Sequence, residues 1–448
     1  MGGSPAERVG RVCTDSREVR VGDLFLALAG GRFDGHEFVG EAVKRGAVAI
    51  VGERGRLPTA LTECAMIAVE DTRKALGRLA AEYRRDFELP TVAVAGSNGK
   101  TTTKELLASV LRQKLATLWS EASFNNDIGV PLTLLRLEKS HQAAVLELGT
   151  NHPGELAPLV RMIRPDYGVI TCIGREHLEF FGDVAGVAQE EGWLAELLPP
   201  QGKLFVNGDD EWAGRIAQRT RASVVRVGFS DRNDWRARAV RLSPKGVIFQ
   251  VDAPDAKFAG EYRIRLLGRH QVVNALFALA LGAELGLNCA EIAQGLADCS
   301  APKMRLQLWE TGGVLVLDDA YNANVDSVRA ALRTLLELPC TGRRMAVLGD
   351  MAELGAHSEA GHEEIGCCAA EWGVGQLFAV GKMAPVMARG ARGAGLTRVF
   401  EFADVEAAGP VVKSFVKSGD VLLLKASRVM RLERIAEVLR AGQAMKEK

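Results

Sequence analysis

The feature that most constrains the fold of this chain is the segment TVAVAGSNGKTTTKELL, residues 91 to 107. TVAVA is a short apolar run typical of a buried strand, and TTTKELL is typical of the first turns of a helix. Glycines between the two allow backbone N–H groups to face an anion, and the helix N-terminus adds positive potential. The segment therefore predicts a phosphate-binding loop made of Gly96, Ser97, Asn98, Gly99, Lys100, Thr101 and Thr102.

Two residues of this loop carry specific chemistry. The ammonium of Lys100 can neutralise phosphate charge, and the hydroxyl of Thr101 can bind Mg²⁺. The spacing departs from the G-x-x-x-x-G-K-[ST] pattern, because Val94 stands at the position of its first glycine. A chance glycine turn before a helix is the alternative, and the strand and helix on either side disfavour it.

The alternation of strands and helices divides the chain into three parts. Two apolar runs, DLFLAL and AVAIVG, and an amphipathic helix over 72–85 come before the loop. Strand and helix then alternate, except for a more β-rich stretch over 234–267 and the helix over 271–285 that follows it. The alternation restarts near 303, with helices over 327–338 and 359–372. We therefore predict an α/β fold with mainly parallel sheets in three domains, at 1–88, 89–302 and 303–448, the middle one P-loop-like and the last Rossmann-like.

Composition points to a small-molecule partner. The 448 residues are 47% hydrophobic and carry no net charge, and no run of like charge predicts binding to nucleic acid or a membrane surface. Eight cysteines without CxxC spacing favour reduced thiols. The first residues lack an apolar signal core, and no run is long enough to span a membrane. We expect a cytoplasmic protein, with a monomer as the default state.

Two further polar residues follow predicted strands. AAVLELG contains Glu147 near its end, and YGVITCIGREH leads to His177. A carboxylate and an imidazole beside a phosphate loop suit a metal ion or an oriented water. Each also has a structural alternative, because Glu147 could cap a helix and His177 could be a hydrogen-bonded core histidine.

Several segments together resemble the Mur ligases, ATP-dependent amino acid ligases of peptidoglycan precursor synthesis. The segments are GSNGKTT at 96–102, SFNNDIGVPLTLL at 123–135, LELGTNHPGEL at 146–156, IGREHLEFFG at 173–182, NGDD at 207–210 and GRHQVVNAL at 268–276. Three more resemble the branch of the family that joins D-alanyl-D-alanine to UDP-N-acetylmuramoyl-tripeptide: 14–38, 317–327 and 348–355. That branch usually has a further strand and helix before the first of these.

The resemblance implies a fold and a reaction. The first domain would bind the UDP-sugar, the central domain would bind ATP, and the last would close over the nucleotide. The γ-phosphoryl group of ATP would pass to the substrate carboxylate, and the amine of D-alanyl-D-alanine would attack the acyl phosphate. Such a reaction needs positioning and charge neutralisation more than a protein nucleophile.

The resemblance also implies roles for individual residues. Lys100, Glu147, His177 and Glu191 would be catalytic, and the metal ligands would be Thr101, Glu147, His177 and Glu191. Outside the loop, Asn274 would face the adenine, and Arg305 and Asp319 would contact the ribose and phosphates, with Tyr321 and Asn322 beside them. The uridine diphosphate would lie against Thr14, Asp15, Ser16, Arg17, Phe33, Asp34, Gly35 and His36, and the peptide stem against Asn125 and Asn126. The acceptor side would be lined by Lys425, Ser427, Arg428 and the loop Asp350 to Gly355.

Glu191 marks a departure from the family. Many Mur ligases have a lysine, carboxylated by CO₂, in a segment resembling VAxAKGEI, and here that segment is VAQEEGWL with Glu191 at the lysine position. We hypothesise that Glu191 supplies the missing anion, if necessary through a water, and removes any need for bicarbonate. The alternative is that Glu190 and Glu191 form a solvated helix face. Glu176, where a small residue is common, and Ala426, where glycine is usual, are smaller departures.

Other functions remain open at this point. A related ligase could add a different amino acid or lengthen a folate tail, although DDAYNAN and GDMAELG argue against this. A degenerate protein that only binds nucleotide is the alternative from a different class. Thr14 to Arg17 could also be a simple polar turn.

Overall fold

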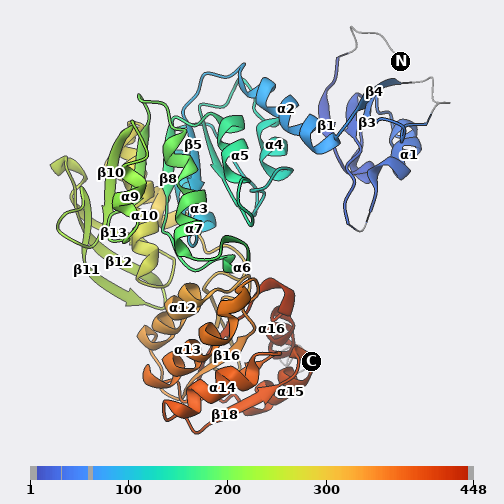
Figure 1. The fold of residues 1–448 in the computed structure, drawn as a ribbon. Helices are drawn as coiled ribbons and strands as arrows, with labels where there is room; N and C mark the ends of the chain where they lie inside the picture. The colour runs from blue at the N-terminus through green and yellow to red at the C-terminus, as the bar shows by residue number, and fades with distance from the viewer. Residues whose placement is uncertain (1–7, 32, 59–63, 442–448) are drawn as a thin grey trace.

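The computed structural model describes residues 8–31, 33–58 and 64–441, which form three sheets, each built from its own stretch of chain (Figure 1). Parallel pairs predominate in all three, and helices cover the sheets, so the predicted α/β fold class is confirmed. Within these residues no helix is long and apolar enough to cross a membrane.

The first unit is a four-stranded parallel sheet in the order β1-β2-β3-β4. Short one-turn helices and α1 complete it, and two buried clusters cover its faces. Its elements are β1 (Arg11–Cys13), η1 (Ser16–Glu18), β2 (Asp23–Leu26), η2 (Gly35–Phe38), α1 (Val39–Lys44), β3 (Ala49–Glu53) and β4 (Ala65–Val69).

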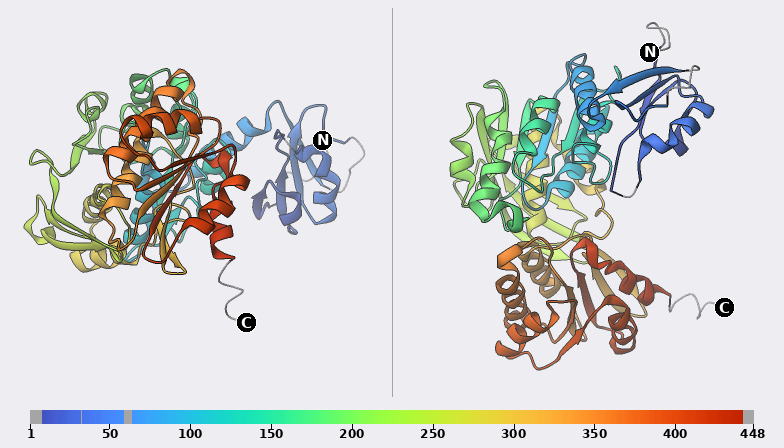
Figure 2. Two further views of the ribbon diagram at one scale, coloured as in Figure 1. Left: turned by 90° about the horizontal axis from the view of Figure 1, so that it is seen from below. Right: turned by 45° about the vertical axis from the view of Figure 1, so that its right-hand side comes forward.

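Helix α2 (Thr72–Arg84) joins the first unit to the second, and Asp71 caps its N-terminus by accepting the N–H of Lys74. Its Leu76 is fully buried in a cluster that includes β2 and β3 together with Ile128 and Leu132 of the central unit. Arg84 donates to the carbonyl oxygen of Ile163 from a buried position. The helix therefore fixes the first unit to the central one (Figure 2).

The central sheet has nine strands in the order β13-β12-β11-β10-β9-β8-β5-β7-β6. Its parallel part is buried on both faces, as continuous apolar strands such as TVAVA predict. The β-rich stretch expected over 234–267 is the antiparallel edge formed by its last three strands. The strands are β5 (Thr91–Ala95), β6 (Thr117–Trp119), β7 (Ala143–Glu147), β8 (Tyr167–Ile170), β9 (Lys203–Asn207), β10 (Ser223–Gly228), β11 (Trp235–Ser243), β12 (Gly246–Asp252) and β13 (Gly260–Ile264).

Helices cover this sheet on both faces. One face is buried with α3, α10 and α11, and the opposite face with α5, α7 and α8. The apolar helix expected over 271–285 is α10, with bounds shifted by one residue. The helices are α3 (Lys100–Leu111), α4 (Gly129–Leu134), α5 (Leu156–Ile163), α6 (Leu178–Phe181), α7 (Val184–Glu191), α8 (Trp193–Glu196), α9 (Ala213–Ala217), η3 (Ala256–Phe258), α10 (His270–Glu284) and α11 (Cys289–Asp298).

The third unit is a six-stranded sheet in the order β14-β15-β19-β16-β17-β18, antiparallel only between β14 and β15. Its strands are β14 (Gln307–Thr311), β15 (Val314–Asp318), β16 (Arg344–Gly349), β17 (Gln376–Val380), β18 (Val399–Phe402) and β19 (Val421–Lys425). Its helices are α12 (Val325–Glu337), η4 (Gly355–His357), α13 (Ser358–Glu371), α14 (Ala384–Gly393), α15 (Val405–Phe415), η5 (Arg428–Met430) and α16 (Glu433–Arg440).

We propose domain boundaries near residues 88 and 302, because no sheet spans either position. The third unit is docked on the central one. One buried cluster contains Leu178 and Phe181 of the central unit together with Met351 and Leu354 of the third. This docking brings the loops after β8 and β16 into contact, which positions the site described next.

Candidate active site

A cavity of about 1730 Å³ lies between the central and third units, with part of α2 in its wall, and is the place where most predicted site residues meet. Its wall includes part of α2, the loop before α3, and the loops of the third unit that follow β15 and β19. The predicted residues that line it are Ser97, Asn98, Gly99, Lys100, Thr101, Thr102, Asn125, Asn126, Glu147, His177, Asn274, Arg305, Asp319, Asn322 and Lys425.

The phosphate loop has the backbone that its glycines allow. Gly96 and Gly99 have φ values of 112° and 86°, in the left-handed region that favours glycine. A Cβ at Gly96 would lie 2.5 Å from the hydroxyl oxygen of Thr171, and a Cβ at Gly99 would lie 2.8 Å from Oδ1 of Asn274. The turn and its close packing therefore both require glycine, and α3 begins directly after it at Lys100.

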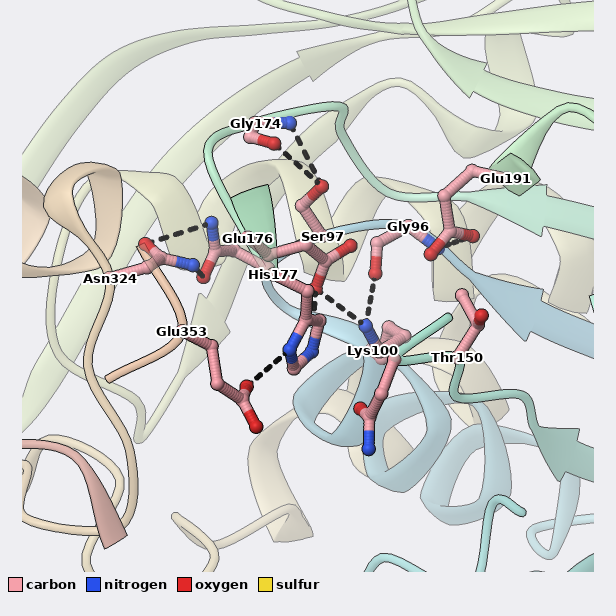
Figure 3. A network of polar contacts seen from close by, with 12 residues as sticks. Gly96, Ser97, Lys100, Thr150, Gly174, Glu176, His177, Glu191, Asn324 and Glu353 are labelled. Carbon is pink, nitrogen blue, oxygen red and sulfur yellow. Dashed lines mark hydrogen bonds and ion pairs between the residues drawn. The ribbon is translucent and has the colours of Figure 1, made fainter. Parts of the chain in front are cut away.

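Lys100 is held from two sides in this structure (Figure 3). Its Nζ donates to the carbonyl oxygen of Gly96 at 2.5 Å and to Oε2 of Glu176 at 3.3 Å, and its side chain is 13% exposed. Burial lowers the pKa of this ammonium, but Glu176, Glu191 and Glu147 outweigh it and raise the pKa. Lys100 is therefore a fixed cation beside the loop where a phosphate would bind.

Glu191 lies behind the phosphate loop, at the end of α7. Its Oε2 accepts the N–H of Gly96 at 2.7 Å, and the residue is fully buried. Burial raises the pKa of its carboxyl to about 8; Lys100 and the Gly96 N–H oppose this rise and Glu176 adds to it. Glu190 is also buried, and accepts the N–H groups of Gly154 and Leu156. The solvated helix face considered above is therefore wrong.

The position of Glu191 limits what it can contact. Neither Glu191 nor Gly96 is among the described residues that line the cavity. Oε1 of Glu191 is buried and accepts no hydrogen bond within the described structure. The carboxyl is thus placed to hold the loop through Gly96 and to influence the pKa of Lys100. Its role as a metal ligand stays a prediction.

Thr101 and Glu147 are in direct contact at the other side of the loop. Oγ1 of Thr101 donates to Oε1 of Glu147 at 3.1 Å, and Nδ2 of Asn125 donates to the same oxygen at 2.9 Å. Oε2 of Glu147 is buried without a hydrogen bond in the described chain. Lys104, fully buried one turn along α3, has its Nζ 3.9 Å from that oxygen. Glu147 is therefore no helix cap but part of the cavity wall.

These residues bear on the predicted Mg²⁺. In the part of the chain that the structure describes, no group of three or more His, Cys, Asp or Glu side chains is arranged to hold a metal ion. Mg²⁺ commonly takes one or two protein ligands and completes its shell with water and phosphate oxygens. Thr101 and Oε2 of Glu147, which accepts no hydrogen bond in the described chain, fit such a site.

His177 faces the cavity from the loop between β8 and α6, and it is not a core histidine. Its Nδ1 lies 2.5 Å from Oε2 of Glu353, in the third unit, and its Nε2 lies 4.0 Å from Oε2 of Glu176. The imidazole is therefore the point at which the central and third units meet over the loop (Figure 3).

The adenine side predicted for Asn274 lies at the start of α10. Nδ2 of Asn274 donates to Oε1 of Gln271 at 2.7 Å, and the side chain packs against Gly99. His270 also lines the cavity, and burial lowers its pKa to about 4. The first turn of α10 thus presents uncharged side chains beside the phosphate loop.

The third unit contributes the opposite wall. Nζ of Lys425 donates to Oδ2 of Asp319 at 2.5 Å and to the carbonyl oxygen of Asn322 at 3.0 Å. The guanidinium of Arg305 lies 4.2 Å from the ring centroid of Tyr321, whose hydroxyl donates to Oγ of Ser123 at 2.9 Å. Tyr321 therefore links the third unit to the central unit beside the predicted nucleotide residues.

Three residues predicted on the acceptor side do not line the cavity. Asp350 accepts the N–H groups of Lys382 and Met383, and Ser427 donates to the carbonyl oxygen of Ala323. Arg428 pairs with Glu433 at 2.9 Å. Asp350 and Ser427 hold loops of the third unit together here, so direct contact with the acceptor stays a prediction.

The residues predicted for the uridine diphosphate lie on the first unit, outside the cavity wall, at η1 and η2, which both contact α1. Asp15 accepts the N–H of Arg17 and pairs with its guanidinium at 2.6 Å. His36 has Nδ1 2.7 Å from Asp34 and accepts the N–H of Glu53 at its Nε2. The remaining members are Thr14, Ser16, Phe33, which is 76% exposed, and Gly35, which packs against Leu28.

The sequence did not predict several members of the site. Glu176, Lys104 and Asn324 contact predicted residues, and Arg73 and Arg78 of α2 line the cavity. The only signal for Glu176 was its departure from the family pattern. Glu353 lies in the loop predicted on the acceptor side and lines the cavity, but nothing in the local sequence marks its contact with His177. The cavity face of α2 has no local signal either.

The glycine loop and its fixed lysine follow β5, where the strand order of the parallel sheet reverses, and they face a second α/β unit across one cavity. This arrangement defines a nucleotide-dependent enzyme of several domains. Comparisons with known proteins identify the family. Residues 8–84, 94–282 and 304–428 match the models for the Mur ligase family catalytic domain, the Mur ligase middle domain and the Mur ligase glutamate ligase domain. The chain belongs to the Mur ligase family.

Individual relatives cover nearly the whole chain. The UDP-N-acetylmuramoyl-tripeptide--D-alanyl-D-alanine ligase of Escherichia coli K12 is 38% identical over 438 residues, 96% of this chain and 93% of that protein. A crystal structure of MurF from Acinetobacter baumannii superposes with a TM-score of 0.88 at 34% identity, covering 96% of this chain and 94% of that one. MurF from Thermotoga maritima, in complex with ADP, has a TM-score of 0.85 at 28% identity, with coverages of 98% and 99%.

Proposed function

We propose that this chain is the ATP-dependent ligase that joins D-alanyl-D-alanine to the carboxylate of UDP-N-acetylmuramoyl-tripeptide, giving the pentapeptide, ADP and phosphate. The observation that carries the proposal is the single cavity in which the phosphate loop faces Arg305, Asp319 and Lys425 of the third unit. The named relatives at 34–38% identity over nearly the full chain support the same substrates.

The chain's own residues account for the first step. A carboxylate is a poor electrophile, and transfer of the γ-phosphoryl group of ATP makes it an acyl phosphate. The loop N–H groups and Lys100 would hold the phosphates, after Lys100 leaves Glu176 for them. Thr101 and Glu147 would hold Mg²⁺, which supplies charge neutralisation at the phosphates.

The second step is attack of the dipeptide amine on the acyl carbon. The C–N bond forms, the tetrahedral intermediate collapses, and phosphate leaves with the electron pair of the C–O bond. The amine loses one proton in the process. Water must stay away from the acyl phosphate, and the docked third unit supports this by contacts such as Tyr321 with Ser123.

We also propose that Glu191 takes the place of the carboxylated lysine of other family members. Two observations support this proposal. Glu191 is buried behind the loop and accepts the N–H of Gly96. Its carboxylate also raises the pKa of Lys100. It would provide the anion near the phosphate site without bicarbonate once it has lost its proton, above its pKa of about 8.

Phosphate release tests the function. ATP and UDP-N-acetylmuramoyl-tripeptide are supplied with D-alanyl-D-alanine or with single amino acids, each with and without bicarbonate. We expect release that depends on the dipeptide and is indifferent to bicarbonate. Release with a single amino acid would instead indicate another ligase of the family, and ATP binding without any release would indicate a degenerate nucleotide-binding protein.

A further inference from the structure

One set of contacts between the central and third units lies beside His177. The N–H of Glu179 donates to the carbonyl oxygen of Glu353 at 3.0 Å, and Nε2 of His357 lies 2.9 Å from the carbonyl oxygen of Gly182. Gly355 allows this approach, because a Cβ there would lie 2.9 Å from Cα of Glu179. The segment 353–357 is therefore packed directly on the turn that carries His177.

Both residues of the central contact have an unusual backbone. His177 has φ 48° and Glu353 has φ 60°, in the left-handed region that residues with a Cβ seldom adopt. Strained conformations of this kind cluster at functional sites, where surrounding structure holds them. Here the two strained residues face each other across the boundary, with Nδ1 and Oε2 2.5 Å apart.

We propose that Glu353 is a positioning residue for His177: docking of the third unit brings its carboxylate to Nδ1 and thereby directs Nε2 toward Glu176 and Lys100. Only the importance of His177 for turnover rests on the proposed function. A carboxylate accepts a hydrogen bond, so the ring proton is held on Nδ1 and the lone pair of Nε2 faces the phosphate end of the cavity. The imidazole is thus correctly oriented only when the units are docked.

A second boundary contact provides the matched control. Arg175, two residues before His177, pairs with Asp326 at 2.6 Å and with Glu364 at 2.7 Å, both in the third unit. Glu364→Ala removes a carboxylate from the same boundary but leaves the contact between His177 and Glu353. Glu353→Gln keeps an oxygen acceptor at Nδ1. Glu353→Ala removes it, and the 41% exposure of this side chain makes loss of folding unexpected.

The tautomer of His177, measured by ¹⁵N NMR of histidine-labelled protein without substrates, tests the inference directly. We expect the Nδ1–H form in the wild type, in Glu353→Gln and in Glu364→Ala, and growth of the Nε2–H form in Glu353→Ala. An unchanged tautomer in Glu353→Ala, or the same change in Glu364→Ala, would overturn the proposal.

Turnover provides the second readout. Orienting partners of such histidines typically contribute about 10- to 100-fold. We expect kcat to fall by this factor in Glu353→Ala with a smaller change in the KM for ATP, and to recover largely in Glu353→Gln. If the tautomer changes in Glu353→Ala but the wild-type protein joins none of the substrates, the result supports the positioning role and contradicts the proposed function. An equal loss of kcat in Glu364→Ala would contradict the positioning role.

Discussion

Glu191 accepts the backbone N–H of Gly96, 95 residues earlier in the chain, at 2.7 Å. The glutamate that departs from the family pattern is therefore bonded to the first glycine of the phosphate loop. Because the carboxyl is fully buried there, its charge and its hydrogen bond have separate consequences that variants can distinguish.

Glu191→Ala should lower kcat by at least about 100-fold at pH 9, where Glu191 is above its pKa of about 8 and carries its charge. The variant removes both this anion near Lys100 and the bond to the loop. Phosphate release with all three substrates measures it. Glu196→Ala, which removes a partly exposed carboxylate paired with Arg219, is the control and should retain activity. Full turnover in Glu191→Ala would refute the role, and Glu191→Lys should regain activity only with bicarbonate.

Stability should depend on pH through Glu191. Its folded-state pKa of about 8 lies above the ordinary 4.5, so the folded chain binds this proton more tightly than the unfolded chain. The resulting stability is full below about pH 4.5 and is lost as the pH rises through 8. Glu191→Gln removes this dependence, so its melting temperature relative to wild type should increase from pH 5 to pH 9. A constant difference across that range would contradict the expectation.

Glu176→Ala should tighten ADP binding. Glu176 holds Lys100 in this structure, so removing its charge frees the ammonium for phosphate and removes an anion beside the site. We expect a Kd about tenfold lower, equivalent to about 1.4 kcal/mol, by isothermal titration calorimetry. Weaker binding would instead show that Glu176 orients Lys100 for the nucleotide.

Lys425→Met should destabilise the third unit by about 3–5 kcal/mol, because Asp319 is left as an unpaired charge in a mostly buried position. Denaturant unfolding measures this change. The double variant Lys425→Met with Asp319→Asn should recover part of the lost stability, because the unpaired charge is also removed. No recovery would mean that the bond to the carbonyl oxygen of Asn322 carries the effect.

Much of the site could be predicted because its pattern is local. The loop from Gly96 to Thr102 lies between a strand and a helix that adjoin it in sequence, and backbone preference and periodicity specify such units. The helices expected over 327–338 and 359–372 begin one or two residues earlier and end one residue earlier in the structure, as α12 and α13. In α12 the capping box of Asn324 and Ser327 sets that start.

Contacts between distant segments could not be predicted in the same way. Lys100 meets Glu176 across 76 residues and His177 meets Glu353 across 176, and neither pairing is marked by the residues adjacent in sequence. Helix α2 was expected to belong to the first unit, yet its buried side chains also pack on the central one.

The sequence by itself determined the strand, loop and helix that can bind a phosphate, because these depend on residues a few positions apart. Tertiary structure decided which side chains surround that loop. Glu191 reaches Gly96 only because α7 covers the sheet beside β5, and Glu353 reaches His177 only because the third unit is docked. Burial and docking are properties of the packed units, so the charge of Glu191 and the orientation of His177 are set by contacts that no short segment contains.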